Sequence, residues 1–167
     1  MKLLNAMATA AVAVVSISVP ALARVDSGTP RLLQTLQDYG VTVRYNPTEC
    51  DSGEFHGLYH IKREMILCYD VPNANAHNTV RHETFHALQH CAALRRGDNR
   101  GIVPLAINHD ERHEFVTSVL STGDITKIKS LYKPAHYQIE LEAFAAAEHY
   151  SADELASLVK SWCWKRN

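Results

Sequence analysis

The spacing of hydrophobic residues along the chain predicts a succession of short strands and amphipathic helices. Apolar residues at helical spacing predict a first helix over residues 29–40, and an alternating pattern predicts a half-buried strand over 41–45. The range 57–69 predicts one or two further strands, most clearly over 65–69. Short strand-forming segments therefore precede the longest helical segment of the chain.

That longest helix is predicted over residues 77–96, which contain no Gly or Pro. Gly97 fits the position just after a helix end, and two arginines favour the last turn. The N-cap candidates follow Pro72 and are Asn73, Asn75 and Asn78. This segment is therefore expected to be a single continuous helix.

Four further helices are predicted downstream. They cover residues 109–120, 125–132, 137–148 and a C-terminal segment that begins at Ser151. Gly123 and Asp124 separate the first two, and Ser151 with Glu154 forms a capping box at the start of the last. Together with the strands near the N-terminus, the pattern predicts one helix-rich α+β domain with a small sheet on its N-terminal side.

Five residues of the longest helix carry the clearest chemical signal: His82-Glu83-Thr84-Phe85-His86, the pattern H-E-x-x-H. Histidines four residues apart lie about 40° apart around a helix, so both imidazoles can reach one metal ion. Glu83 lies about 100° from His82, where its carboxylate can reach a water on the metal without being a ligand. The pattern predicts a zinc ion held by His82 and His86, with Glu83 as the general base.

The helix that carries this motif has two different faces. Gln89 and His90 share the polar side with the two histidines, whereas Leu88 and Cys91 are among the residues on the opposite, apolar side. His90, one turn past His86, is a candidate to support the metal site. A solvated histidine is equally consistent with the pattern at this position.

A catalytic zinc site usually takes three protein ligands and leaves the fourth position to water. The Ala-rich segment 137–148 offers Glu142 and Glu140 as the third ligand. Glu142 shares its stripe of the helix with Ile139, Ala145 and Ala146, whose sizes let the face pack closely against another helix. We therefore expect Glu142 to be the ligand, with Glu140 as the alternative. A solvated, purely structural role for these carboxylates remains the other interpretation.

H-E-x-x-H followed by a glutamate on a later helix resembles the zinc arrangement of the gluzincin metallopeptidases, and in particular the minimal, secreted gluzincins. The resemblance implies a zincin-like fold with a small sheet packed on the motif helix. It implies one Zn²⁺ per chain, with His82, His86 and Glu142 as ligands and Glu83 as the base. It places the strand that binds substrate in extended form on Met65–Cys68. The family offers no counterpart for the stretch 99–133.

The metzincin pattern does not fit, because position 92, where a third histidine would be required, is Ala. Gluzincins also use a Tyr or His donor to stabilise the tetrahedral oxyanion. Tyr137, His136, His149 and Tyr150 flank the helix of the third ligand, and His149 lies on the stripe of Glu142. The sequence does not choose among them, since a Tyr at a helix end is often structural.

A second histidine pair, His109 and His113, has the same spacing. Asp110 between them is shorter than the glutamate of a zinc peptidase, and Glu114 is the only evident further ligand. The pair can form an exposed helix surface or line the substrate cleft.

The N-terminus has the features of a secretory signal peptide. Lys2 precedes an apolar run, and Ala21 and Ala23 form a signal-peptidase site. We expect cleavage after Ala23, so that residues 1–23 are removed and 24–167 form a secreted or periplasmic domain without a membrane span. The 17 Lys and Arg nearly balance 18 Asp and Glu without a basic stripe, so no nucleic-acid partner is expected.

The four cysteines follow Ala23 and fit an exported chain with two disulfides, for which three pairings are possible. Cys50–Cys68 would close a loop around the strand pair. Cys91–Cys163 would tie the motif helix to the C-terminal segment, and Cys91 lies about 180° from His82, away from the metal. We expect these two pairings and no cysteine ligand.

Together these observations predict a zinc metallopeptidase that acts on a peptide or protein substrate. Two alternatives remain: a catalytically silent, disulfide-stapled binding module, and a zinc hydrolase of a non-peptide amide. The presence of Glu83 favours an enzyme over a silent module, because only hydrolysis needs the base. Nothing in the sequence separates peptides from other amides or indicates an oligomeric state.

Overall fold

The computed structural model describes residues 27–53, 55–68, 74–98, 101–106 and 108–163. The elements in chain order are α1 (Thr29–Asp38), β1 (Thr42–Tyr45), η1 (Thr48–Ser52), β2 (Gly57–His60), β3 (Glu64–Leu67), α2 (Ala74–Arg95), α3 (His109–Val119), α4 (Thr122–Leu131), η2 (Pro134–His136), α5 (Tyr137–His149) and α6 (Ala152–Trp162). This confirms the predicted helix-rich α+β fold with a small sheet on the N-terminal side.

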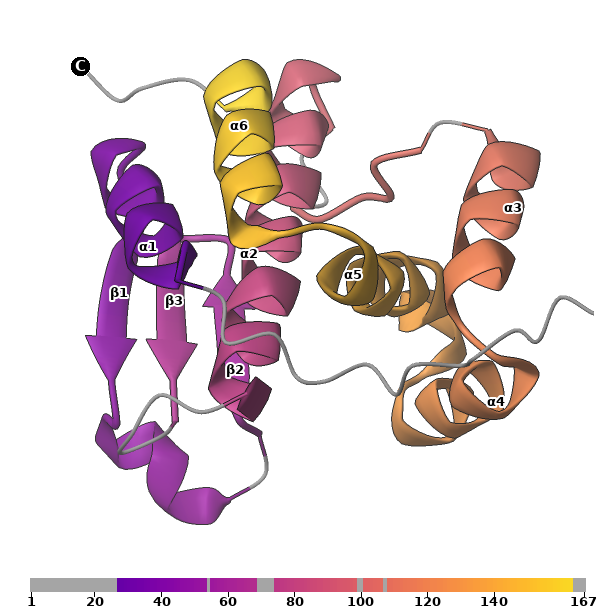
Figure 1. Ribbon diagram of the computed structural model, residues 1–167, viewed down its shortest axis with the longest axis horizontal. Coiled ribbons are helices and arrows are strands. Elements are labelled where there is room, and N and C mark those ends of the chain that lie inside the picture. Colours follow the sequence, from indigo (N-terminus) through magenta and orange to yellow (C-terminus); the bar gives the residue numbers. More distant parts are fainter. Residues whose placement is uncertain (1–26, 54, 69–73, 99–100, 107, 164–167) are drawn as a thin grey trace, which may run out of the picture.

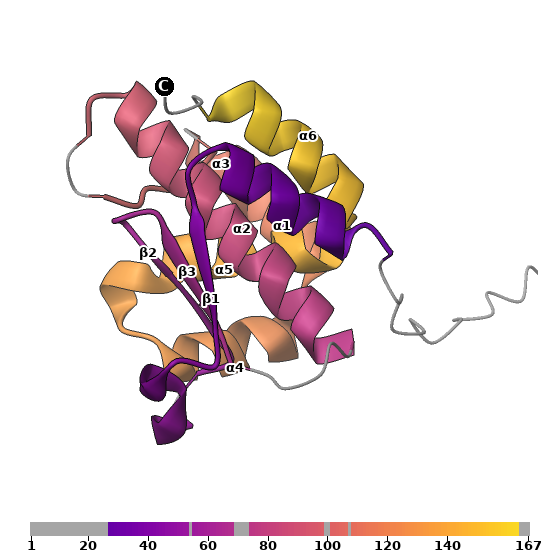
Figure 2. The same cartoon turned by 90° about the vertical axis from the view of Figure 1, so that its left-hand side faces the viewer.

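The sheet has the strand order β1-β3-β2, in which β3 runs parallel to β1 and antiparallel to β2. Figure 1 shows the sheet at one end of the molecule, α3 and α4 at the other, and α2 between them. In Figure 2, where the sheet is seen close to edge-on, α1 and α6 lie on one side of it. The long motif helix α2 contacts β2 and β3 of the sheet and also α5, on which α3 and α4 pack.

The central position of β3 changes one expectation. The sequence places a substrate-binding strand on Met65–Cys68, but Met65 to Leu67 lie in β3, both edges of which are paired. A substrate strand needs an edge whose backbone groups are free. The strand that offers such an edge beside α2 is β2, whose partner on one side is β3.

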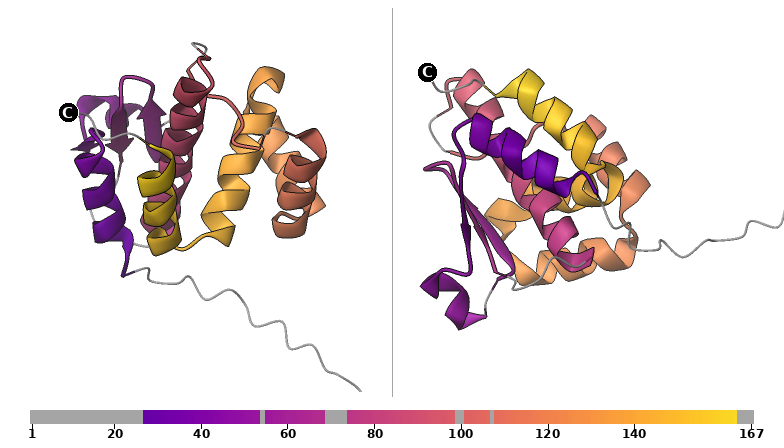
Figure 3. Two further views of the ribbon diagram at one scale, coloured as in Figure 1. Left: turned by 90° about the horizontal axis from the view of Figure 1, so that it is seen from above. Right: turned by 60° about the vertical axis from the view of Figure 1, so that its left-hand side comes forward.

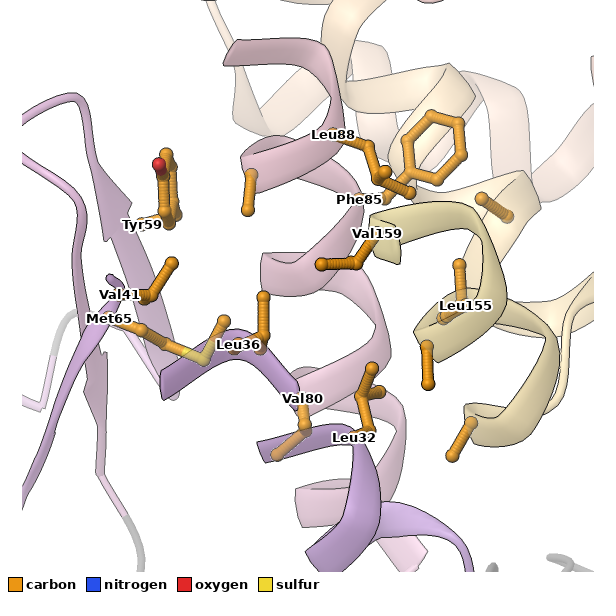
Figure 4. Close-up of a cluster of buried hydrophobic side chains, with 14 of the residues drawn as sticks. Leu32, Leu36, Val41, Tyr59, Met65, Val80, Phe85, Leu88, Leu155 and Val159 are labelled. Atoms are coloured by element: carbon orange, nitrogen blue, oxygen red, sulfur yellow. The ribbon is translucent and has the colours of Figure 1, made fainter. Parts of the chain in front are cut away.

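The main hydrophobic core lies between the sheet, α1, α2 and α6 (Figure 4). Each helix contributes one apolar stripe, as the spacing of leucine and valine predicts. Fully buried members are Leu32, Leu36, Val80, Leu88, Leu155 and Val159. The side-by-side arrangement of α1 and α6 is visible in Figure 3. The start of α6 is fixed by the predicted capping box of Ser151 and Glu154.

Two disulfides are formed, Cys50–Cys68 and Cys91–Cys163, and both predicted pairings are confirmed. The first joins η1 to the residue after β3. The second joins α2 to the end of α6. The motif helix is thus covalently held against the C-terminal helix on its apolar side.

One further expectation is wrong, and two others concern residues that the structure does not describe. Gly123 and Asp124 do not separate α3 from α4: Ser121 caps α4, and Asp124 completes a capping box, so both residues belong to the first turn of α4. The predicted signal peptide, residues 1–23, and Tyr69 at the end of the predicted strand lie outside the described residues. Within the described part of the chain, none of the helices has the length and apolarity needed to cross a membrane.

Candidate metal centre

Helix α2 presents His82 and His86 on one side, one turn apart, and both are buried. Their Nε2 atoms lie 3.1 Å apart, and the ring of His82 meets the edge of Phe144 from α5. Alanines of α5 are fully buried where the two helices meet, so the backbones approach closely. The motif therefore projects into the junction of α2 and α5.

The third side chain at this junction is Glu140, in the first turn of α5. Its Oε2 lies 3.4 Å from Nε2 of His82 and 3.6 Å from Nε2 of His86. Ligands of a tetrahedral zinc at bond lengths of about 2.0–2.1 Å lie about 3.3 Å from one another. The three ligand atoms thus have the mutual spacing that one metal ion requires, and they form the group of three that could hold it in the described part of the chain.

The polar atoms of this group are short of partners. Oε2 of Glu140 and Nδ1 of His82 are buried and lack a hydrogen-bond partner among the described residues. A buried acceptor without a partner is costly, so such an atom calls for a bound ligand or ion. Two histidines and a carboxylate are also the donor set of many catalytic zinc sites. The residues present therefore fit a metal ion.

Electrostatics couples the three side chains. Burial alone would raise the pKa of Glu140, but the two adjacent imidazoles lower it to about 2. Burial opposes the charged form of His86, yet Glu140 and the nearby Glu83 raise the pKa of this histidine above its ordinary value. The pocket thus attracts a positive charge, as a cation site should.

Glu83 lies beside the group but is not part of it. Its side chain is 5 % exposed, and burial raises the pKa of its carboxyl despite the opposing effect of His82 and His86. The start of β2 comes very close to this carboxylate: a Cβ on Gly57 would lie 2.9 Å from Cγ of Glu83 and 2.4 Å from Cγ2 of Thr79. The absence of a side chain at position 57 therefore lets β2 approach the predicted base.

A cleft of about 640 Å³ opens onto these residues. It runs between β2 and the start of α5, and most of its walls are apolar. The lining residues are Phe55, Gly57, Leu58, Tyr59, Ile61, His82, Glu83, His86, Ile102, Leu131, Tyr132, His136, Ile139 and Glu140. The candidate metal ligands and the predicted base thus share one accessible cavity.

The carboxylate that joins the two histidines is Glu140, the alternative of the sequence analysis, and not Glu142. Residues 140 and 142 lie about 200° apart on a helix, so only one can face the metal site. Small neighbours correctly indicate that Glu142 is buried, at 2 % exposure. Its face of α5 packs on Gln89 and on the backbone of Leu105 and Ala106, away from the two histidine Nε2 atoms.

Of the other predicted support residues, His90, Tyr137 and His149 are not among the residues that line the cleft. His90 hydrogen-bonds through Nδ1 to the hydroxyl of Tyr59 at 2.9 Å. The ring of Tyr137 faces the ammonium group of Lys129, and both residues line a separate hollow. His149 packs edge-on against Phe115 and Tyr150. Of the candidate oxyanion donors, His136 is the one that lines the cleft.

The second histidine pair does not join a group of three metal-ligating side chains in the described residues. The rings of His109 and His113 stack with 6.2 Å between their centroids, and they line a separate hollow of about 260 Å³ with Arg112 and Lys129. This hollow and the cleft lie on different sides of α5. The pair therefore does not line the cleft beside the motif.

Tyr132 is the cleft residue that the sequence analysis missed. It follows α4 directly, and burial together with the carboxylates of Glu140 and Glu83 raises the pKa of its hydroxyl above the usual range. The hydroxyl therefore stays protonated and can donate a hydrogen bond near the metal site. Only the tertiary fold brings the end of α4 to α2, so no local pattern in the sequence could have identified this residue.

Comparisons of this chain with models of known families, with curated proteins and with solved structures find no match. The geometry of the His82, His86 and Glu140 group therefore carries the functional argument.

Proposed function

We propose that this protein is a secreted or periplasmic zinc metallopeptidase, formed by residues 24–167 after removal of a signal peptide. The single observation that carries the proposal is the buried group of His82, His86 and Glu140, which opens with Glu83 onto one cleft. Two disulfides fit an oxidising compartment. The proposal assigns one Zn²⁺ to this group, because two imidazoles and a carboxylate form a typical set of catalytic zinc ligands.

Bound zinc would polarise the substrate carbonyl and lower the pKa of a water to about 7. The chain itself supplies the proton transfer. Glu83, whose pKa is raised by burial, accepts the proton from the attacking water and returns it to the leaving amine. A base works best when its pKa lies near the working pH, and burial moves that of Glu83 in this direction.

The substrate in this proposal is an extended peptide along β2. His56 accepts a backbone hydrogen bond from Cys68, so alternate residues of β2 bond to β3 and those between them face outward. The backbone groups of Gly57 and Tyr59 point away from β3, and both residues line the cleft, where the backbone of Tyr59 also hydrogen-bonds to the carboxylate of Glu83. Leu58 and Ile61 line the cleft with 41 % and 49 % of their surface exposed, and they favour apolar side chains in the bound peptide.

The same proposal gives Tyr132 the role of hydrogen-bond donor to the developing oxyanion. Its hydroxyl remains protonated near the ligand Glu140 and lies at the wall of the cleft. Such donors act on the charge that develops in the transition state. His136, which lines the same cleft, is the second candidate for this donor role.

The test measures zinc content and cleavage of a mixed quenched-peptide library for the wild type and Glu83→Gln. We expect about one zinc per chain in both proteins. Cleavage should fall by about 10²–10⁴-fold in the variant, because glutamine keeps the volume but cannot accept the proton. Equal cleavage by both would exclude Glu83 as the base. Zinc binding without cleavage of any peptide would favour the binding module or the hydrolase of another amide.

A further inference from the structure

Glu142 is a buried carboxylate with three hydrogen-bond donors and no role in the proposed reaction. Its Oε2 accepts from the backbone N–H of Leu105 at 2.6 Å and from Nε2 of Gln89 at 2.8 Å. Its Oε1 accepts from the backbone N–H of Ala106 at 2.9 Å. A carboxylate can only accept hydrogen bonds, so these contacts fix which groups of its neighbours point toward it.

The contact with Gln89 determines the orientation of that side-chain amide. Nε2 of Gln89 lies near two acceptors, the carboxylate of Glu142 and the backbone carbonyl of Ile139 at 3.1 Å. Only the NH₂ end of the amide can donate to both. The carbonyl oxygen of Gln89 must therefore point the other way, and it lies 2.8 Å from Nδ1 of His86.

This orientation determines in turn where His86 carries its proton. An amide oxygen accepts, so Nδ1 of the neutral imidazole must be the protonated nitrogen. Nε2 of His86 then has a free lone pair, directed at Nε2 of His82 and Oε2 of Glu140. This is the tautomer that a metal ligand needs at this nitrogen.

We propose that Glu142 is a positioning residue that, through Gln89, holds His86 in the Nδ1–H tautomer and in the orientation that binds the metal. The inference rests on the proposed function for its consequence, zinc affinity, but not for the tautomer itself. His82 has no corresponding support, because its Nδ1 lacks a hydrogen-bond partner among the described residues. The orientation of the site therefore depends strongly on the His86 side.

The same carboxylate connects the metal site to a wall of the cleft. Leu105 and Ala106 follow Ile102, a cleft residue, three and four positions later in the loop before α3. Arg96 fixes that segment further by donating to the carbonyls of Pro104 and Leu105. Because Glu142 binds both this segment and Gln89, it couples the position of the wall to the orientation of His86.

Glu142→Gln tests the inference because all three groups around this side chain are hydrogen-bond donors. The substitution replaces one accepting oxygen by an NH₂ group, which is itself a donor. If the new NH₂ faces Gln89, the amide of Gln89 must turn over and offer its own NH₂ to Nδ1 of His86, which would then carry its proton on Nε2. Loss of such supporting contacts typically weakens metal binding by about 10–100-fold. The matched control is Glu148→Gln, because Glu148 lies exposed on the same helix and contacts Asn78 instead.

The primary measurement is the tautomer of His86 in the metal-free protein at alkaline pH, read from the ring nitrogen NMR shifts. We expect the Nδ1–H form in the wild type and in Glu148→Gln, and a shift toward Nε2–H in Glu142→Gln. A wild type with its proton on Nε2 would overturn the inference, as would a tautomer unchanged in both Glu142→Gln and Gln89→Leu, since the second variant removes the acceptor whichever way the new amide at position 142 turns. This readout needs no zinc, so its failure is distinct from a failure of the proposed function.

Zinc affinity by chelator competition gives the second measurement and includes a rescue. The double variant Gln89→Glu with Glu142→Gln reverses the polarity of the pair: the new amide at 142 donates to the new carboxylate at 89, which again accepts from Nδ1 of His86. It should bind zinc more tightly than Glu142→Gln alone, a result that a merely structural role does not predict. If Glu142→Gln fails to fold, Gln89→Leu removes the same acceptor, and zinc affinity equal to the wild type in that variant would overturn the inference.

Discussion

At the scale of single residues, the site is governed by which atoms lack partners. Nε2 of the two histidines and Oε2 of Glu140 converge within 3.1–3.6 Å of one another, and the carboxylate oxygen is buried without a hydrogen bond from the described residues. Neighbouring carboxylates in contrast have protein partners, as Glu142 does with three donors. The presence or absence of hydrogen-bond donors from the protein therefore distinguishes Glu142, a structural carboxylate, from Glu140, the candidate metal ligand two residues away.

The first residue-scale prediction ranks the two carboxylates. Glu140→Gln should weaken zinc binding more than Glu142→Gln, because the former removes a ligand atom and the latter only perturbs a supporting contact. Chelator competition on both variants and on the control Glu148→Gln measures the order. A stronger effect of Glu142→Gln would return Glu142 to the ligand position that the sequence alone favours.

The second residue-scale prediction concerns pH. The pKa of His86 is raised above 6.5 by Glu140 and Glu83, which outweigh the lowering effect of burial. The titration midpoint of His86 in the metal-free protein, followed by NMR, should therefore lie above 6.5 and move down in Glu140→Gln. Since the proton competes with zinc for this nitrogen, zinc affinity should rise with pH through this range. A wild-type midpoint below 6.5 would contradict the assignment.

At the scale of elements, the site depends on how closely β2 approaches α2. Gly57 begins β2 and faces Thr79 and Glu83, where a Cβ would come within 2.4 and 2.9 Å of side-chain carbons. Because α2 is packed on its other side against α5 and α6, it cannot retreat easily. The close approach of β2 to Glu83, the proposed base, is thus made possible by the absence of a side chain at position 57.

Gly57→Ala should accordingly destabilise the protein by about 1–3 kcal/mol, the usual cost of overpacking. The control is Gly123→Ala in the first turn of α4, where a Cβ would meet only Ser121 Oγ at 3.6 Å. Alanine there should be neutral or stabilise by up to about 1 kcal/mol. Urea unfolding of the metal-free variants measures both. Equal stability of Gly57→Ala and wild type would show that β2 can shift away without cost.

The sequence predicted individual helices and local motifs better than it predicted how these elements pack together. Helix α2, the capping box of α6 and the His82–His86 pair follow from local spacing, and the structure places them accordingly. The parallel pairing of β1 with β3 cannot be predicted from local spacing, because β2 lies between these two strands in the sequence. The selection of Glu140 over Glu142 and the position of Tyr132 depend on how α5 packs on α2 and α4 on α5, which no local pattern encodes.

At the scale of the whole molecule, one disulfide closes the segment that contains β2 and β3, and the other ties the motif helix to α6. Cys50–Cys68 spans 18 residues and encloses β2, which lines the cleft, and β3. Cys91–Cys163 spans 72 residues and joins α2 to α6 across the core. The long crosslink encloses α3, α4 and α5, so it restricts the unfolded chain over the whole segment that supplies Glu140 and Tyr132.

Removal of the long crosslink should therefore cost more stability than removal of the short one. Chain-entropy considerations give about 4 kcal/mol for a loop of this length, against about 3 kcal/mol for the short loop. The paired variants Cys91→Ala/Cys163→Ala and Cys50→Ala/Cys68→Ala should be compared by urea unfolding without metal.

The reverse order would mean that native-state packing, rather than restriction of the unfolded chain, dominates the contribution of these crosslinks to stability.

The stability that zinc adds to each paired variant shows whether a disulfide also orients the metal site. A ligand that binds only the folded state adds the same increment of stability to every variant whose site is intact. We expect an equal increment in both paired variants, because neither disulfide contacts His82, His86 or Glu140. A smaller increment after loss of Cys91–Cys163 would show that this crosslink also orients α2 against α5 at the metal site.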